Sequence, residues 1–137
     1  MRLFLDTNVL ASAFGTRGLC LDLLRLVLDE HELLVSIPLL DELERVLEEK
    51  FGVPGPDRAA AREVLLACTT VSASASVPVI DCPDPTDIPL LAAALSASAE
   101  FFVTGDKALL GMESVKGMPI VSPRDAWVIL FAPHLAR

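Results

Sequence analysis

Short apolar segments alternate along this chain with longer segments whose apolar residues recur at a helical period. Strands that are apolar on both sides are typical of a parallel sheet with both faces covered, and strands alternating with helices are typical of α/β domains. We therefore predict a three-layer α/β/α fold with a central, mainly parallel sheet. The predicted strands are Arg2–Leu5, Leu33–Ser36, Val77–Ile80, Phe101–Thr104 and Pro119–Val121, and the predicted helices are Leu19–Asp29, Pro38–Lys50, Asp57–Cys68, Asp87–Ala97 and Ser122 to about Phe131.

Local signals mark several helix boundaries and faces. The segment Pro38–Lys50 has one apolar face and one charged face, as a helix at a protein surface does. The last helix has Ser122 as its cap and Pro123 in its first position, and Pro133 is expected to end it. The segment Leu19–Asp29 is apolar nearly all round, so it needs cover on most sides, from the core or from a second copy of the chain.

The whole chain, residues 1–137, is expected to form a single domain. A domain of this size buries most of the surface of its unfolded chain, and 53% of the residues are apolar. No repeat or long linker divides the sequence. The one low-complexity patch, Val71–Val77, alternates small polar and apolar residues and is either a loop or an edge strand.

The charge balance argues against a protein that coats nucleic acid through a basic face. Lysine and arginine total 11 against 19 aspartate and glutamate residues, a net charge of -8. Aromatic residues make up 5% of the chain, with no tyrosine, which argues against a base-stacking platform. An enzyme that reaches phosphates through bound cations stays compatible with this composition.

The cysteines and the apolar stretches indicate a cytoplasmic protein. Cys20, Cys68 and Cys82 are odd in number and widely spaced, which supports neither a disulfide framework nor a zinc site. Asp6 interrupts the first apolar run, so no signal peptide is visible. The longest apolar stretch, Ile88–Ala99, is shorter than the roughly 20 residues of a membrane span, and no membrane segment is expected.

Two aspartates directly follow predicted strands. Asp6 comes after the first strand, and Asp106 follows Phe101–Thr104 with Gly105 between them, where a glycine permits a sharp turn. In a parallel sheet the carboxyl ends of the strands form the ligand-binding edge, so both acids are candidate site residues. Each has a plainer interpretation, because Asp6 can cap a helix beginning near Asn8 and Asp106 can belong to a Gly-Asp turn.

A third acid, Asp87, lies where a helix is predicted to begin. With Thr86 as the cap, Asp87 takes the first helical position and Pro89 the third, which places the carboxylate beside the positive helix terminus. Complementing the helix dipole is the plainer interpretation of this placement. Asp81 and Asp84 are rivals for the same role, and the sequence leaves open whether Asp84 replaces or assists Asp87.

Glu42 is the fourth candidate, near the edge of the apolar stripe of its helix. Glu44 points roughly 200° away around that helix and is the better candidate for a solvated charge, although Glu42 too can be a surface residue. Four carboxylates brought together repel one another, and a hard divalent cation, Mg²⁺ or Mn²⁺, removes that conflict. His31 and His134 lie away from these motifs, which disfavours hydrolases that depend on a histidine base.

In order and spacing, these motifs resemble the PIN-domain family, the metal-dependent ribonucleases that include the toxins of VapC-type toxin–antitoxin pairs. The opening Asp-Thr-Asn after an apolar strand is one such motif. Two positions depart from the pattern: Ala108 stands where many members carry a further acid, and Ile88 where Asn or Asp is common. The segments that carry the resemblance are Arg2–Leu10, Ser36–Glu44, Asp84–Ala94, Val103–Leu110 and Ile120–Arg124.

This resemblance implies an endoribonuclease that hydrolyses single-stranded RNA with Mg²⁺ or Mn²⁺. It also implies a homodimer and a small antitoxin partner, for which we expect a basic residue that reaches the acids. The ligands and catalytic residues would be Asp6, Glu42, Asp87 and Asp106, the residues that orient them Thr7, Asn8 and Thr104, and the phosphate contacts Arg17 and Lys107.

Other phosphoryl-transfer proteins fit less well. Haloacid dehalogenase-type phosphatases need Asp-x-Asp where this chain has Asp6-Thr7-Asn8, and a response-regulator receiver needs an early acidic pair. Neither a dinucleotide-binding nor a P-loop glycine motif occurs. The remaining alternative is a catalytically silent PIN-like module that binds RNA or protein.

Overall fold

The computed structural model describes residues 1–71 and 80–135, with side chains described as far as residue 131. Its described part contains a six-stranded sheet of order β3-β2-β1-β4-β6-β5. All neighbouring strands pair in parallel except β5 and β6, so the predicted α/β class with a mainly parallel sheet is confirmed. The strands are β1 (Arg2–Leu5), β2 (Glu32–Ser36), β3 (Thr69–Val71), β4 (Phe101–Val103), β5 (Ser114–Val115) and β6 (Met118–Val121).

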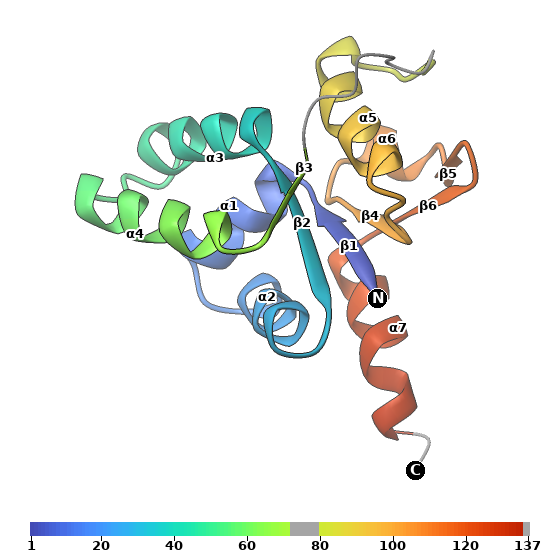
Figure 1. Cartoon of the computed structure of the whole chain (residues 1–137), viewed down its shortest axis with the longest axis horizontal. Coiled ribbons are helices and arrows are strands. Elements are labelled where there is room, and N and C mark those ends of the chain that lie inside the picture. The colour runs from blue at the N-terminus through green and yellow to red at the C-terminus, as the bar shows by residue number, and fades with distance from the viewer. Residues whose placement is uncertain (72–79, 136–137) are drawn as a thin grey trace.

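Helices cover both faces of the sheet. Both α2 and α5 contact β2, and Figure 1 shows these two helices on opposite sides of the central strands. In addition, α2 packs against α1 and α7, while α3 packs against α1 and α4. The helices are α1 (Thr7–Gly15), α2 (Leu19–Glu30), α3 (Ile37–Glu49), α4 (Gly55–Leu66), α5 (Ile88–Ser96), α6 (Lys107–Leu110) and α7 (Pro123–Leu135), with a short 3₁₀ turn, η1 (Pro85–Asp87).

Apolar side chains from adjacent strands meet in the core because the strands are parallel and in register. Phe4 on β1 is paired with Phe102 on β4, and both are fully buried. Their rings stack with centroids 5.5 Å apart. Residues that follow these two strands are therefore held on a rigid frame.

The strand register brings the carboxyl ends of three strands to one edge of the sheet. Leu5 on β1 is opposite Val103 on β4, and Val103 is opposite Val121 on β6. Each strand is followed within two or four residues by a helix, α1, α6 or α7, so the first turns of these helices lie along this edge. It is the edge where parallel α/β sheets bind ligands.

The strand next to β2 differs from the predicted one. β3 is Thr69–Val71, directly after α4, whereas Val77–Val79 of the predicted strand lie outside the described residues and Ile80 is in no strand. The β-branched residues of β3 suit a strand. The strand is nevertheless too short to show an alternation of apolar and polar residues, and it closely follows the end of a helix. Of the low-complexity patch, only Val71 belongs to β3 in the described residues.

Two further corrections concern β5 and α7. The short β5 was not predicted; it forms a hairpin with β6 around Lys116 and Gly117, which have φ angles of 46° and 85°. Helix α7 continues to Leu135, so the prediction that Pro133 ends it near Phe131 is wrong. A proline removes only its own N–H from the hydrogen-bond ladder, and residues after it can keep helical geometry.

The expectation that the second helix must be covered on most sides is also wrong. α2 buries one face, through Leu23, Leu24 and Val27, while Asp22 and Arg25 are exposed. Leu19 and Leu28 of the same helix are also exposed. Within the described residues, no helix combines the length and apolar character of a membrane span.

Candidate active site

Asp6 is a buried carboxylate at the carboxyl end of β1. Its backbone N–H donates to the Val103 carbonyl at 2.8 Å, so the sheet holds it in place. Oδ1 accepts from the Thr7 N–H at 2.8 Å, which caps α1, and Oδ2 accepts from the Thr104 hydroxyl at 2.7 Å. Burial raises the pKa of Asp6 and these hydrogen bonds oppose the rise, while the charge of Asp106 adds to it.

Thr104 connects Asp6 with Asp106. Its hydroxyl oxygen is fully buried and accepts the Asp106 backbone N–H at 3.0 Å while donating to Asp6 Oδ2. Because an ionised carboxylate can only accept, the hydroxyl hydrogen is directed at Asp6. The arrangement fixes the Asp6 carboxylate relative to the loop that carries Asp106.

Asp106 caps α6 at the carboxyl end of β4. Its Oδ1 accepts from the backbone N–H groups of Ala108 at 2.8 Å and Leu109 at 3.1 Å. Its side chain is exposed, and Oδ2 accepts no hydrogen bond from the described residues. Lys107 follows it, also exposed, and has no ion pair within the described part of the chain. One oxygen of Asp106 is therefore available to a ligand.

Asp87 is half-buried and has no side-chain hydrogen bond at the start of α5. Burial, followed by the charges of neighbouring acids, raises its pKa to about 6. Like charges raise a pKa in this way when they lie within electrostatic range of the group. The contributing acids are Asp6, Asp84, Asp106 and Glu42.

Asp84 has a different role from Asp87. Its Oδ1 accepts from the N–H and the hydroxyl of Thr86, at 3.0 and 2.8 Å, which caps η1 and lowers the pKa of the exposed Asp84 carboxyl. The predicted start of the helix with Thr86 as its cap is therefore wrong, since η1 comes first and α5 begins at Ile88. Because Asp84 does the capping, the Asp87 carboxylate is left for the cluster.

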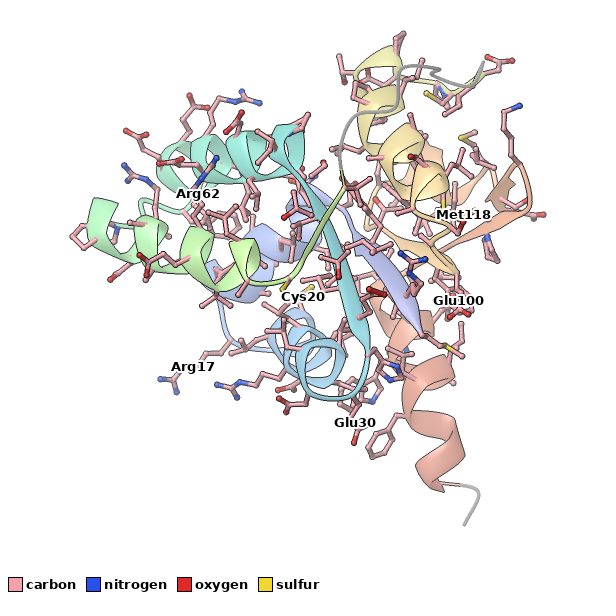
Figure 2. The ribbon with its side chains drawn as sticks, viewed as in Figure 1. Arg17, Cys20, Glu30, Arg62, Glu100 and Met118 are labelled. Carbon is pink, nitrogen blue, oxygen red and sulfur yellow. The ribbon has the colours of Figure 1, made fainter. Side chains whose placement is uncertain are left out.

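Glu42 lies on α3, whose first turn is capped by the Ser36 hydroxyl accepting from the Leu39 N–H at 3.3 Å. It is half-buried, and its charge contributes to the raised pKa of Asp87. Glu44 is exposed and lies 3.5 Å from the guanidinium of Arg62, which Figure 2 shows between α3 and α4. Glu42 is therefore within electrostatic range of Asp87, whereas Glu44 is paired with Arg62.

The remaining residues predicted for the site differ in placement. Thr7 is buried beside Asp6, and its Oγ1 has no hydrogen-bond partner in the described part of the chain. Asn8 is exposed on the first turn of α1, and its side chain makes no hydrogen bond to any described residue. Arg17 is not brought to the acids: it follows the far end of α1, which separates it from Asp6 by about 13 Å of helix, and it points outward in Figure 2.

His31 does not enter the site. His31 Nδ1 lies 3.1 Å from the N-terminal amine of Met1, at the amino end of β1 and so at the opposite edge of the sheet. The side chain of His134 lies outside the described side chains. The described site is therefore made of oxygen donors alone.

Oxygen donors of this kind suit Mg²⁺ or Mn²⁺. Clustered carboxylates gain most from such a cation because it removes their mutual repulsion, and the buried Thr7 hydroxyl offers a further polar atom beside Asp6. As the side chains lie, however, no three acid, imidazole or thiol groups of the described residues are close enough to hold a metal ion. The donor chemistry fits the cation, and binding it requires the side chains to move closer together.

Comparisons with known proteins agree with this fold. No curated protein sequence matches the chain. A chain in the crystal structure of VapBC2 from Rickettsia felis bound to a DNA fragment from their promoter is similar in fold, with a TM-score of 0.63 and 16% sequence identity. That similarity covers 89% of this chain and 98% of the other. The family model of the PIN domain matches residues 2–108, so this chain belongs to the PIN-domain family.

Proposed function

We propose that this chain is an endoribonuclease that hydrolyses single-stranded RNA with Mg²⁺ or Mn²⁺. The observation that carries the proposal is the joining of Asp6 and Asp106 through the Thr104 hydroxyl, with Asp87 and Glu42 in electrostatic range. Membership of the PIN-domain family supports a nuclease in general terms. The catalytic acids in this proposal are Asp6, Glu42, Asp87 and Asp106.

The residues of the proposed site have different roles, which follow from their surroundings. Asp6, Asp87 and Asp106 would hold the cation, with Glu42 bound directly or through water. A bound divalent ion lowers the pKa of a water molecule and stabilises charge on the attacking and leaving oxygens. Thr104 keeps the Asp6 carboxylate oriented, Thr7 and Asn8 lie beside it, and Lys107 can contact substrate phosphate.

We further propose that the protein is the toxin of a toxin–antitoxin pair, acts in the cytoplasm and forms a homodimer. The likeness to a chain of VapBC2 and the VapC-like motifs support the first point. The antitoxin would place a basic residue, best an arginine, against the acids, because a guanidinium binds carboxylates in a bidentate fork.

Light scattering tests the dimer: a mass that stays near the 14.7 kDa of one chain at every concentration would contradict it.

The reaction is tested with a mixed RNA pool, Mn²⁺ and the purified chain. Wild type should cleave the RNA, and Asp6→Asn should lower the rate at least 10–100-fold, because an amide is a weaker ligand than a carboxylate. Calorimetric titration with Mn²⁺ should show a parallel loss of affinity. Equal cleavage or equal Mn²⁺ binding by the two proteins would remove Asp6 from the site.

Glu42→Gln and Glu44→Gln form a matched pair on one helix for the same two assays. The first should weaken Mn²⁺ binding and cleavage, while the second should leave both close to wild type because Glu44 faces Arg62. The reverse order would show that the other face of α3 serves the site. RNA binding without any cleavage by wild type would favour the catalytically silent binding module instead.

A further inference from the structure

The start of α7 lies at the same edge of the sheet as Asp6 and Asp106 because of the way β6 pairs with β4. Val121 at the end of β6 is opposite Val103 at the end of β4, and its carbonyl accepts the Thr104 N–H at 3.0 Å. Asp106 follows the end of β4 by three residues, and Arg124 follows the end of β6 by the same number. The two residues therefore follow neighbouring strands at the same edge of the sheet.

Arg124 is also free to bind an anion. It is exposed, and within the described side chains it makes no ion pair or hydrogen bond, although the chain is acidic. Other arginines are engaged at the surface. These pairs are Arg2 with Glu32, Arg45 with Glu49, Arg58 with Glu48, and Arg62 with Asp41 and Glu44.

The position of Arg124 distinguishes it from the other unpaired cations of the described chain. Arg17 and Arg25 lie on or beside α2, and Lys50 follows α3 at its carboxyl end, far from β2. Lys116 lies in the turn that begins β6, at its amino end. Lys107 and Arg124 alone among the described basic side chains follow strands at the edge that carries the acids. A polyanion that reaches this acidic site needs such flanking positive charge to offset repulsion.

We propose that Arg124 is a substrate-binding residue that contacts a phosphate of single-stranded RNA next to the phosphate held at the acids. This rests on the proposed ribonuclease function. Neighbouring strands are about 4.8 Å apart, so β6 lies roughly 10 Å from β1 and Asp6, which suits an adjacent phosphate better than the one being cleaved. The guanidinium fork binds phosphate in a bidentate manner, and the amino end of α7 contributes a positive potential beside it.

Steady-state cleavage of a fluorescein-labelled single-stranded RNA with Mn²⁺ tests this role. Arg124→Gln should raise KM about 10-fold and leave kcat within about 2-fold, as expected for a lost phosphate contact outside the reacting centre. The slope of log(kcat/KM) against log salt concentration should become shallower by about 0.7. The KM of Arg124→Lys should fall between those of wild type and Arg124→Gln, because lysine keeps the charge but loses the guanidinium fork.

The matched control is Arg25→Gln, which removes the same charge from an exposed, unpaired arginine on α2. Kinetics and salt dependence of Arg124→Gln equal to those of Arg25→Gln would overturn the inference. So would a lower melting temperature together with a reduced kcat and unchanged KM, since that pattern indicates a structural role.

Binding of the same RNA, followed by fluorescence anisotropy in an Asp6→Asn background, separates this inference from the proposed reaction. A wild type that binds RNA but never cuts it contradicts the ribonuclease proposal, while a roughly 10-fold weaker binding by Arg124→Gln still supports the phosphate contact. Unchanged binding by Arg124→Gln refutes the contact whatever the activity. A chain that binds no RNA contradicts both.

Discussion

Asp6 and Asp87 are carboxylates of one cluster with different surroundings. Asp6 is the more buried, but hydrogen bonds from Thr7 and Thr104 favour its ionised form and oppose the rise in its pKa. Asp87 has no such donor, so burial and the neighbouring acids raise its pKa to about 6. A cation that binds this cluster must displace a proton from Asp87 near or below that pH, which makes its affinity pH-dependent.

We predict that Asp87→Asn stabilises the protein in EDTA at alkaline pH. The pKa of the Asp87 carboxyl is higher in the folded chain than its ordinary 3.8. Ionisation therefore weakens folding as pH rises from about 4 through 6. Solvent screening reduces the effect to about 1 kcal/mol, roughly 2–4 °C in melting temperature at pH 8, and the gain should vanish near pH 4.

The matched control for this measurement is Glu63→Gln, an exposed acid on α4 outside the cluster, which should shift the melting temperature little at either pH. A melting temperature for Asp87→Asn below that of wild type at pH 8 in EDTA would contradict the repulsion between these acids. With saturating Mn²⁺ the order should reverse, because wild type then gains more from binding the ion.

At the scale of elements, α1 ends against the chain that follows α3. A Cβ on Gly15 would lie 2.6 Å from Cδ1 and 3.2 Å from Cβ of Phe51. The ring therefore packs directly on the glycine. Beside this contact is an apolar cavity of about 470 Å³ that reaches α4 and contains none of the four acids. The contact between Gly15 and Phe51 holds the end of α1 against the chain that follows α3, and it involves none of the four acids.

We predict that Gly15→Ala lowers the free energy of unfolding by roughly 1–3 kcal/mol, because the added methyl group forces Phe51 to shift in a packed contact. Urea denaturation measures the change, and RNA cleavage at a permissive temperature should stay close to wild type. Adding Phe51→Leu should restore part of the loss by making room.

Gly55→Ala is the control, since a Cβ there meets nothing nearer than the Arg58 side chain at 3.8 Å. It should cost much less than Gly15→Ala because no packed side chain blocks the added methyl group, and any loss there comes from the preference of a residue before Pro56 for an extended backbone. Equal losses in Gly15→Ala and Gly55→Ala would contradict the Phe51 contact as the cause of the loss at Gly15.

At the scale of the whole molecule, a net charge of -8 and an acidic site make a free chain that repels RNA unless cations are present. The same charge favours a basic partner. Expression of the chain alone in a bacterial host should slow growth and deplete an RNA species, while Asp6→Asn should do neither. Identical growth and RNA levels for the two chains would contradict the toxin proposal and leave a PIN-domain protein of other purpose.

The alternation of apolar strands and helices was sufficient to predict the fold class, because each signal is local. Caps, prolines and apolar faces act within a turn or two of helix, so the boundaries of β1, α2 and α3 were predicted to within a residue or two. The same locality made Asp6 and Asp106 recognisable as acids that follow strands. Local signals did not predict β3, because this short strand lies near a helix end and its position depends on pairing with β2.

What the sequence determined by itself was therefore the order of the elements and the acids attached to them. Only the tertiary structure decided which side chains meet. Asp84 is engaged in capping, whereas Asp87 is left without a capping hydrogen bond. Arg17 follows the far end of α1, while Arg124 follows β6 at the edge of the sheet that carries Asp6 and Asp106. Thr104 donates to Asp6 across a separation of 98 residues. Such contacts depend on strand pairing and packing between distant segments, which no local pattern of residues specifies.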